Sequence, residues 1–360
     1  MAIEIRSPAS ITPDWLEQVL AAGGEKARVT SFTAKRVGTG QIGDTYRFSL
    51  VCEGAAGTHQ RTIVGKFPSE GIESRQTGIA LNNYLREVKF YQHLAKTALI
   101  HTPRVYFTDI NEQTHDFVLM MEDLSPAEQG DQLRGVSMEQ AFLVMDEAAK
   151  LHASHWEDDA IEELSWVSGT RAAPVSPATP EAIGALWGAF CGRYGARVTA
   201  EAKAVGETLC QHIEAYFNRG GPRALAHMDF RPDNMMFASA AGGYPVTTLD
   251  WQSIAFGTGA TDVAYFLAGA ITVEQRREHE KALTGRYLER LAQLGVKGYT
   301  RPDFERDYAG GSFQLFLTAF YAAVVVTQTA RGDDMFFQML NGATAQIQDT
   351  HALERLKAGS

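Results

Sequence analysis

The chain has 360 residues, a mass of 39.4 kDa and a formal net charge of −10 at pH 7. Hydrophobic residues make up 45% and charged residues 21%, a globular composition that argues against disorder as the main state. The acidic balance argues against broad electrostatic binding to nucleic acid or to anionic membranes, although it is compatible with a local phosphate pocket. Three scattered cysteines are too few for a disulfide framework or a zinc site, so we expect a reducing, cytoplasmic location.

The length predicts two domains or one large bilobed unit, whose first third is mostly β-structure. Thr12, Pro13 and Asp14 are typical of a helix start, with a capping hydroxyl, a first-turn proline and an acidic residue. Alternating β-rich runs at 30–37, 46–52 and 61–67 predict an antiparallel meander. A helical pattern follows at 81–95, and two more strands are predicted at 104–109 and 117–122.

Beyond residue 125 the pattern is mainly helical. Helices are predicted at 138–156, 184–194, 201–217, 273–294 and 308–330, with short strands at 234–237 and 246–250. The apolar run 320–326 is too short to span a bilayer, so we expect no membrane segment. The outline is an α+β protein with a small antiparallel β-rich lobe and a larger helical lobe.

The residues from His227 to Asn234 have the form H-x-D-x-x-x-x-N, and a short apolar strand after them ends at Asp250. Phosphoryl transfer needs a carboxylate that orients the acceptor hydroxyl and takes its proton. It also needs an amide and a second carboxylate that hold Mg²⁺ against the nucleotide phosphates. Asp229, Asn234 and Asp250 supply these groups in this order. A polar loop followed by a capping aspartate would explain either half of the pattern, but not both together.

In these residues the chain resembles the kinase superfamily, and within it the aminoglycoside phosphotransferase and choline kinase-like branch, which includes ecdysteroid kinase-like proteins. The resemblance covers roughly residues 30 to 270. It implies a bilobed, protein kinase-like fold, with a nucleotide-binding lobe at 1–121, a hinge at 122–125 and a catalytic and substrate-binding lobe at 126–360. It also implies ATP, with GTP possible, and Mg²⁺ as cofactors.

The resemblance further implies a phosphate-covering loop and a hinge in the first lobe. Residues 38–43 match G-x-G-x-x-G, with the three glycines Gly38, Gly40 and Gly43. A strand-like run follows them, which favours a β-turn-β lid over a dinucleotide fingerprint, since the latter needs a helix. A plain hairpin turn is the alternative. Residues 118–124 resemble the strand and hinge of the family, where backbone groups from Glu122 to Leu124 would bind adenine.

A strand lysine and a helix glutamate complete the resemblance. Lys66 stands where the family places the lysine that contacts the α- and β-phosphates, and Glu87 matches the helix glutamate that pairs with it. Taken alone, each would be an ordinary surface charge. Arg231 is either a γ-phosphate contact that stabilises charge developing in transfer or a bridge to Asp233. We leave these two roles open.

Other polar residues are assigned structural roles. Asp262 resembles a family aspartate that braces the loop after the metal site. His152 and His155 have H-x-x-H spacing, but on an amphipathic helix we expect core packing and a buried hydrogen bond rather than metal binding. Met228 departs from the branch, where glycine is common between the histidine and the aspartate.

Only eleven residues separate Asp250 from Asp262, and no Ala-Pro-Glu segment follows, so there is no room for a long peptide-docking segment. A small-molecule hydroxyl acceptor is therefore favoured. An aminoglycoside would need an acidic pocket, for which surface acids such as Asp307, Asp333 and Asp334 are candidates. Two aromatic stripes, at 187–194 and 313–324, would suit an apolar alcohol but are more typical of core. A protein kinase and a non-catalytic nucleotide-binding scaffold remain the alternatives.

Overall fold

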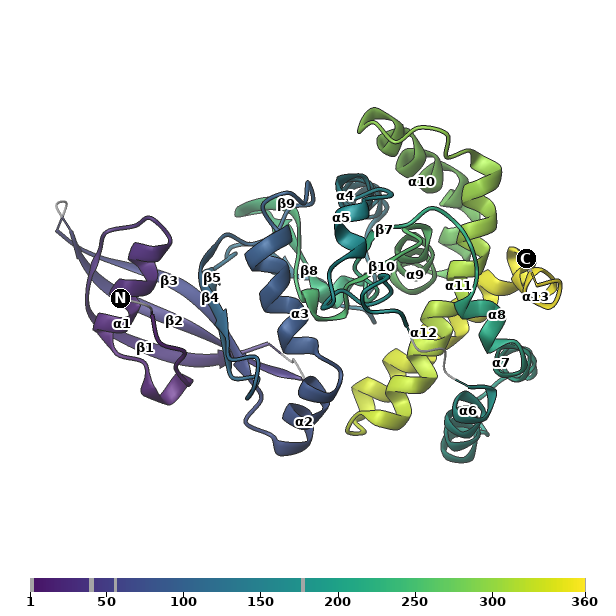
Figure 1. The fold of residues 1–360 in the computed structure, drawn as a ribbon, viewed down its shortest axis with the longest axis horizontal. Helices are drawn as coiled ribbons and strands as arrows, with labels where there is room; N and C mark the ends of the chain where they lie inside the picture. Colours follow the sequence, from purple (N-terminus) through teal and green to yellow (C-terminus); the bar gives the residue numbers. More distant parts are fainter. Residues whose placement is uncertain (1–2, 39–41, 55–56, 176–178, 360) are drawn as a thin grey trace.

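The computed structural model describes residues 3–38, 42–54, 57–175 and 179–359. It confirms the predicted fold class: an antiparallel β-rich part lies at one end and a mainly helical part at the other (Figure 1). The N-terminal part runs α1 (Pro13–Ala22), β1 (Arg28–Val37), β2 (Gly43–Gly54), β3 (Gly57–Pro68), α2 (Ile72–Ala80), α3 (Asn83–Lys89), β4 (Val105–Ile110) and β5 (Phe117–Glu122). The predicted helix start is confirmed, since the Thr12 hydroxyl accepts from the Trp15 amide at 3.3 Å.

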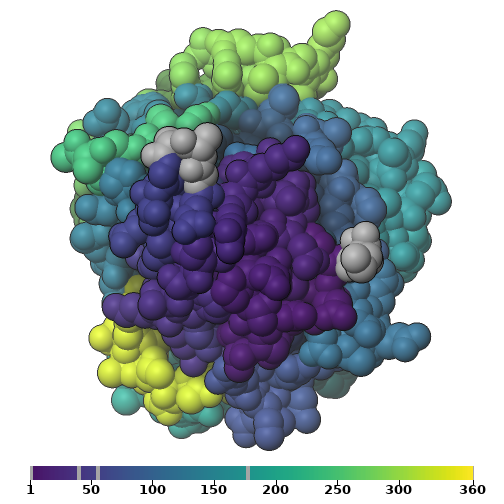
Figure 2. Space-filling model, turned by 90° about the vertical axis from the view of Figure 1, so that its left-hand side faces the viewer, coloured from purple at the N-terminus to yellow at the C-terminus, as the bar shows by residue number. Residues whose placement is uncertain are grey.

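The five strands form one antiparallel sheet in the order β1-β2-β3-β5-β4. Strand β5 is buried on both faces. Its side chains alternate, so Val118 and Met120 pack with α1 while Leu119 and Met121 pack on the side of α3. Burying one such side chain contributes roughly 1.5–3 kcal/mol. The sheet is therefore held between two helices, and Figure 2 shows α1 and its neighbouring strands, in purple and blue, in front of the helical part.

The helix predicted at 81–95 is divided differently in the structure. Asn82 has a φ of 55°, a left-handed conformation that asparagine tolerates, and it separates α2 from α3. After Lys89 the chain continues as one π-helical turn, Phe90–Leu94. The apolar periodicity continues across both irregularities, so it predicted the helix but not the residue at which the helix begins.

The C-terminal part contains ten helices and two small sheets among the described residues. Its helices are α4 (Met138–Ser154), α5 (Asp159–Glu162), α6 (Pro180–Tyr194), α7 (Ala200–Gln211), α8 (Ile213–Phe217), α9 (Ala260–Ala270), α10 (Val273–Gln293), α11 (Arg301–Val325), α12 (Ala330–Asp349) and α13 (Ala352–Lys357). Its strands are β6 (Glu128–Gln129), β7 (Ala224–Ala226), β8 (Met235–Ser239), β9 (Gly242–Thr248) and β10 (Ala255–Gly257), paired as β6-β8-β9 and β10-β7.

Several of these helices differ from the sequence prediction. The predicted helix 308–330 ends at Val325, and a separate helix, α12, begins at Ala330. Helices α9 and α12 were not predicted. All eleven residues of α9 are buried, so no polar face marks its period in the sequence. The helix predicted at 201–217 is two helices, α7 and α8.

Helix α11 is the one described helix that is long and apolar enough to cross a membrane by length and composition. Within its most apolar window 56% is buried inside the molecule. It packs against α9, α12 and α6, so core packing accounts for its apolar residues. Phe313, Phe316 and Phe320 lie in the same buried cluster as Trp187 and Phe190, which confirms that both aromatic stripes are core.

Glycine at position 342 lets α12 approach α9. A Cβ added there would lie 2.0 Å from the Ala268 carbonyl oxygen, a backbone atom that cannot rotate away. We expect Gly342→Ala to lower the free energy of unfolding by about 3 kcal/mol, because the two helices must separate. Gly188→Ala in α6 is the matched control, since its Cβ would meet nothing within 4 Å. Urea unfolding of both variants measures the difference, and equal stability would contradict close packing at Gly342.

Candidate active site

Asp262 holds the loop that follows β7. Its carboxylate is fully buried and accepts hydrogen bonds from the backbone amides of His227 at 2.7 Å and Met228 at 2.9 Å. The His152 ring also lies 3.2 Å from its Oδ2 atom. These contacts agree with the predicted bracing role of Asp262 and with the predicted buried hydrogen bond of His152. His155 instead contacts Asp158 at 2.8 Å and Thr97 at 3.1 Å.

Met228 occupies a left-handed backbone conformation, with a φ of 66°. Such a conformation costs a residue with a Cβ roughly 1–2 kcal/mol, whereas glycine adopts it freely. This is the physical reason why glycine suits the position. The two hydrogen bonds to Asp262 hold His227 and Met228 in the turn, and the loop keeps its shape despite the methionine.

Asp229 lies at the centre of a hydrogen-bond network. Its Oδ1 accepts from Tyr265 Oη at 2.8 Å and from Arg231 Nε at 3.0 Å, and its Oδ2 accepts from Asn234 Nδ2 at 2.8 Å. Burial alone would raise the pKa of Asp229. The positive charge of Arg231, together with His227 and the donors Tyr265 and Asn234, outweighs burial, so the pKa lies below its usual value. Asp229 is therefore an anion at neutral pH.

The orientation of Asn234 follows from its neighbours. The carbonyl oxygen and the Oδ2 atom of Asp229 are both acceptors, each 2.8 Å from the same atom of Asn234, so that atom must be the amide nitrogen. The side-chain oxygen of Asn234 then points elsewhere and is left for another ligand. The Leu249 amide donates to the Asn234 carbonyl at 2.8 Å, which places Asn234 beside the chain leading to Asp250.

Lys66 joins the two parts of the molecule. Its Nζ atom lies 2.7 Å from Glu87 Oε2 in α3 and 2.9 Å from Asp250 Oδ1 after β9. Lys66 lies in β3, and Gly43 lies in the neighbouring strand β2. A Cβ at position 43 would lie 3.2 Å from Lys66 Cε, so glycine leaves room for the lysine side chain. The structure thus brings Lys66, Glu87 and Asp250 together, as the sequence predicts.

Burial and the neighbouring charges together set the pKa values of Lys66 and Glu87 in this trio. Burial acts to lower the pKa of Lys66, but the two carboxylates outweigh it and the pKa is raised, so the ammonium is retained. Burial raises the pKa of Glu87, against the effect of Lys66 and with that of Asp250. Two carboxylates share one cation here, which leaves the trio one negative charge in excess when all three are ionised.

The structure describes only part of the predicted glycine-rich loop. Gly38, directly after β1, has a φ of 78°, which favours glycine there. Gly40 lies outside the described residues. The Tyr84 hydroxyl of α3 donates to the Ile42 carbonyl at 2.5 Å and so ties the residue before β2 to the helix that carries Glu87.

At the predicted hinge, the Glu122 side chain accepts from the Arg104 amide at 2.7 Å. The Leu124 carbonyl closes a turn with the Ala127 amide at 2.9 Å. These contacts hold the segment in place. Adenine binding by its backbone stays a prediction.

Arg231 forms the carboxylate bridge that was one of its two predicted roles. Besides Asp229, its Nη1 lies 2.7 Å from Asp233 Oδ2 and 3.3 Å from Met335 Sδ on α12. Arg331 at the start of α12 lies 3.3 Å from the other oxygen of Asp233. Helix α12 is thus attached to the loop that carries Asp229 through two arginines. A γ-phosphate contact by Arg231 stays a prediction.

Sequence reasoning missed Tyr265, Arg331 and Met335 as residues of this site. Tyr265 lies on the fully buried α9, three residues after Asp262, and that spacing on one helix face was the available signal. Arg331 and Met335 lie on α12, about a hundred residues from the loop they contact, and no local pattern connects them.

The donor set fits a magnesium nucleotide. Mg²⁺ prefers oxygen ligands and is usually held by one or two protein groups together with phosphates and water. The Asp250 carboxylate and the side-chain oxygen of Asn234 are such groups, and Lys66 lies 2.9 Å from Asp250. Among the described residues no cluster of three or more His, Cys, Asp and Glu could hold a metal by itself.

The acids considered for a cationic acceptor all have partners. Asp307 is buried against Arg306 and Tyr299, at 3.0 and 2.9 Å. Asp333 accepts from Tyr194 at 2.6 Å, and Asp334 lies 3.3 Å from Arg197. None of the three is a free carboxylate awaiting a cation.

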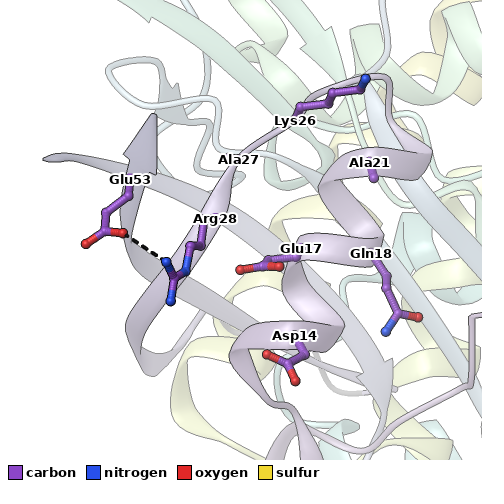
Figure 3. Close-up of a pocket in the computed structure, with 8 residues that line it drawn as sticks. All are labelled: Asp14, Glu17, Gln18, Ala21, Lys26, Ala27, Arg28 and Glu53. Atoms are coloured by element: carbon purple, nitrogen blue, oxygen red, sulfur yellow. Dashed lines mark ion pairs between the residues drawn. The ribbon is translucent and has the colours of Figure 1, made fainter. Parts of the chain in front are cut away.

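A hollow of about 660 Å³ lies away from this site, beside α1 (Figure 3). An ion pair between Arg28 and Glu53, 3.7 Å apart, borders it, and the Glu17 side chain there accepts from the Val29 amide at 2.8 Å. None of the predicted site residues lines it. We assign it no part in the chemistry.

Asp262 supplies a test of the loop geometry. In Asp262→Asn the new side-chain NH₂ replaces one of the two carboxylate oxygens, so it must face the backbone N–H of His227 or Met228. Two hydrogen-bond donors then oppose each other in a buried position. We expect a loss of about 3 kcal/mol in the free energy of unfolding, with reduced activity. Asp146→Asn, which weakens a surface pair with Arg286, is the control. Equal urea midpoints for the two variants would contradict the bracing role.

The fold is kinase-like, and the network joins Lys66 to Glu87 and Asp250. The sequence pattern of the phosphotransferase enzyme family matches residues 33–303, and the chain belongs to that family. It is therefore a phosphotransferase of the small-molecule kinase class. No curated protein matches the sequence.

Three solved structures have a similar fold at low sequence identity. An ethanolamine kinase from Plasmodium vivax has 10% identity and a TM-score of 0.52, over 98% of this chain and 86% of that one. A choline kinase from Streptococcus pneumoniae has 13% identity and a TM-score of 0.50, over 92% and 98%. A microcompartment-associated aminopropanol kinase has 14% identity and a TM-score of 0.54, over 95% and 98%. The resemblance to ecdysteroid kinase-like proteins in particular stays a prediction.

Proposed function

We propose that the protein transfers the γ-phosphate of Mg²⁺-ATP to a hydroxyl of a small molecule. The observation that carries the proposal is the position of Lys66, whose ammonium lies between Glu87 of the first lobe and Asp250 of the second. It supports the proposal because a cation that suits phosphates lies 2.9 Å from the Asp250 carboxylate, a group that suits Mg²⁺. Residues 1–121 would form the nucleotide-binding lobe, 122–125 the hinge and 126–360 the catalytic and substrate-binding lobe, in the cytoplasm.

The roles of the residues follow from their chemistry. Lys66, held by Glu87, would bind the α- and β-phosphates, beneath the loop that carries Gly38, Gly40 and Gly43. Asn234 and Asp250 would hold Mg²⁺, which supplies neutralisation of phosphate charge when bound. Backbone groups near Glu122 and Leu124 would hold the base of ATP or GTP.

Asp229 would accept a hydrogen bond from the acceptor hydroxyl and hold its oxygen in line with the γ-phosphorus. As the new oxygen–phosphorus bond forms, the bond to the leaving ADP oxygen breaks, and the hydroxyl proton passes to Asp229. The products are the phosphate ester, ADP and the proton. The low pKa of Asp229 suits a late proton transfer, because it keeps the group ionised before the reaction.

Two experiments test the proposal. Calorimetric titration with ATP and GTP, with and without Mg²⁺, is expected to show metal-dependent nucleotide binding. A transfer assay then uses ethanolamine, choline, aminopropanol, an aminoglycoside and a sterol as acceptors. The first three come from the substrates named for the similar structures. Nucleotide binding without transfer to any acceptor or to water would favour a non-catalytic scaffold, and transfer only to protein would favour a protein kinase.

A further inference from the structure

The two oxygens of Asp229 have different surroundings. Oδ1 receives two donors, Tyr265 Oη at 2.8 Å and Arg231 Nε at 3.0 Å. Among the described residues Oδ2 receives only Asn234 Nδ2, at 2.8 Å. A carboxylate oxygen has about two lone-pair sites, so Oδ1 is filled and Oδ2 has one site open.

We infer that Tyr265 is a positioning residue that fills Oδ1 of Asp229 and so directs the acceptor hydroxyl to Oδ2. The inference rests on the proposed function and adds to it the identity of the oxygen that receives the proton. Oδ1 also faces the Arg231 cation, which makes it the poorer base of the two. The proton of the acceptor hydroxyl therefore passes to Oδ2 as the oxygen–phosphorus bond forms.

Tyr265 is well placed to hold the carboxylate still. Its side chain is 1% exposed, and it lies on α9, one turn after Asp262, which holds the backbone of the same loop. One helix thus fixes the loop through Asp262 and the carboxylate through Tyr265. Because α9 is buried along its whole length, the side chains of Asp262 and Tyr265 are held by packing on all sides.

Tyr265→Phe removes only the hydroxyl. Asp229 then keeps Arg231 on Oδ1 but gains a second open position, so the hydroxyl can approach an unproductive oxygen. The probe is Mg²⁺-ATP with water as the acceptor, read by phosphate release, together with the best acceptor of the panel above. We expect kcat to fall about ten- to a hundredfold, with KM and Kd for ATP unchanged.

Tyr308→Phe is the matched control. Tyr308 is also a buried tyrosine, 3% exposed, whose hydroxyl donates to the carboxylate of Glu280 at 2.6 Å, outside the site. A purely structural role for Tyr265 predicts equal losses of thermal stability and equal kcat in the two variants, and that result would overturn the inference. A loss in Tyr265→Phe that appears in the Kd for ATP instead of kcat would also overturn it.

The failure of the inference is separable from that of the proposed function. If Asp229→Asn abolishes transfer while Tyr265→Phe matches Tyr308→Phe, only the inference fails. If Asp229→Asn is fully active, or if the wild-type protein transfers phosphate to no acceptor, both fail.

Discussion

Asp229→Asn is expected to reduce phosphate transfer by about 10²- to 10⁴-fold, the usual contribution of a general base. The amide of the new residue cannot take a proton from the acceptor. Its NH₂ group would also face Asn234 Nδ2, which now lies 2.8 Å from Oδ2, so two donors would meet. Initial rates with saturating Mg²⁺-ATP and the best acceptor of the panel measure the loss.

The control for this variant is nucleotide binding. Asp229 has no predicted contact with the nucleotide, so the affinity for Mg²⁺-ATP should change by no more than about twofold. Asp159→Asn, at a side chain that is 91% exposed, controls for the loss of one negative charge. Turnover in Asp229→Asn equal to that of Asp159→Asn would remove Asp229 from the chemistry.

Asp250→Asn is expected to weaken Mg²⁺-ATP binding by about 10- to 100-fold and to leave metal-free ATP binding nearly unchanged. Its neutral amide is a poorer ligand for a hard cation than a carboxylate. The substitution also removes one of the two ion-pair partners of Lys66, which then pairs only with Glu87. Calorimetric titration with and without Mg²⁺ separates the two effects.

The choice of asparagine matters because Asp250 has a φ of 65°. Asparagine tolerates this left-handed conformation about as well as aspartate does, whereas alanine adds a strain of about 1 kcal/mol. Comparison of Asp250→Asn with Asp250→Ala therefore distinguishes loss of a ligand from distortion of the turn. Undiminished Mg²⁺-dependent affinity in Asp250→Asn would contradict the metal-binding role.

Much of the site could be predicted because its parts lie in short local patterns. Lys66, Glu87 and Asp250 were each marked by a motif or an element, and their order matched one known arrangement. The pairing of Lys66 with Glu87 was implied by the resemblance, whereas the direct contact of Lys66 with Asp250 was not predicted. The strands of the sheet could be predicted equally well, since alternation of apolar and polar residues marks a strand with one buried face.

The rest depends on contacts that no local pattern records. Tyr265 lies on a helix without a polar face, and Arg331 reaches Asp233 across about a hundred residues of chain. The break at Asn82 and the left-handed Met228 are single backbone choices that periodicity does not show. The role of Arg231 stayed open for the same reason, because the partners that decide it lie partly on α12.

The place of α12 has a consequence for how such enzymes diverge. The family pattern ends at residue 303, while α12 begins at Ala330 and reaches back to the catalytic loop through Arg331 and Met335. Mutations in α12 therefore alter the neighbourhood of Asp229 without touching the segment that defines the family. Substitutions at 331 and 335, outside the family pattern, can thus reach the loop that carries Asp229 while every residue of the pattern stays the same.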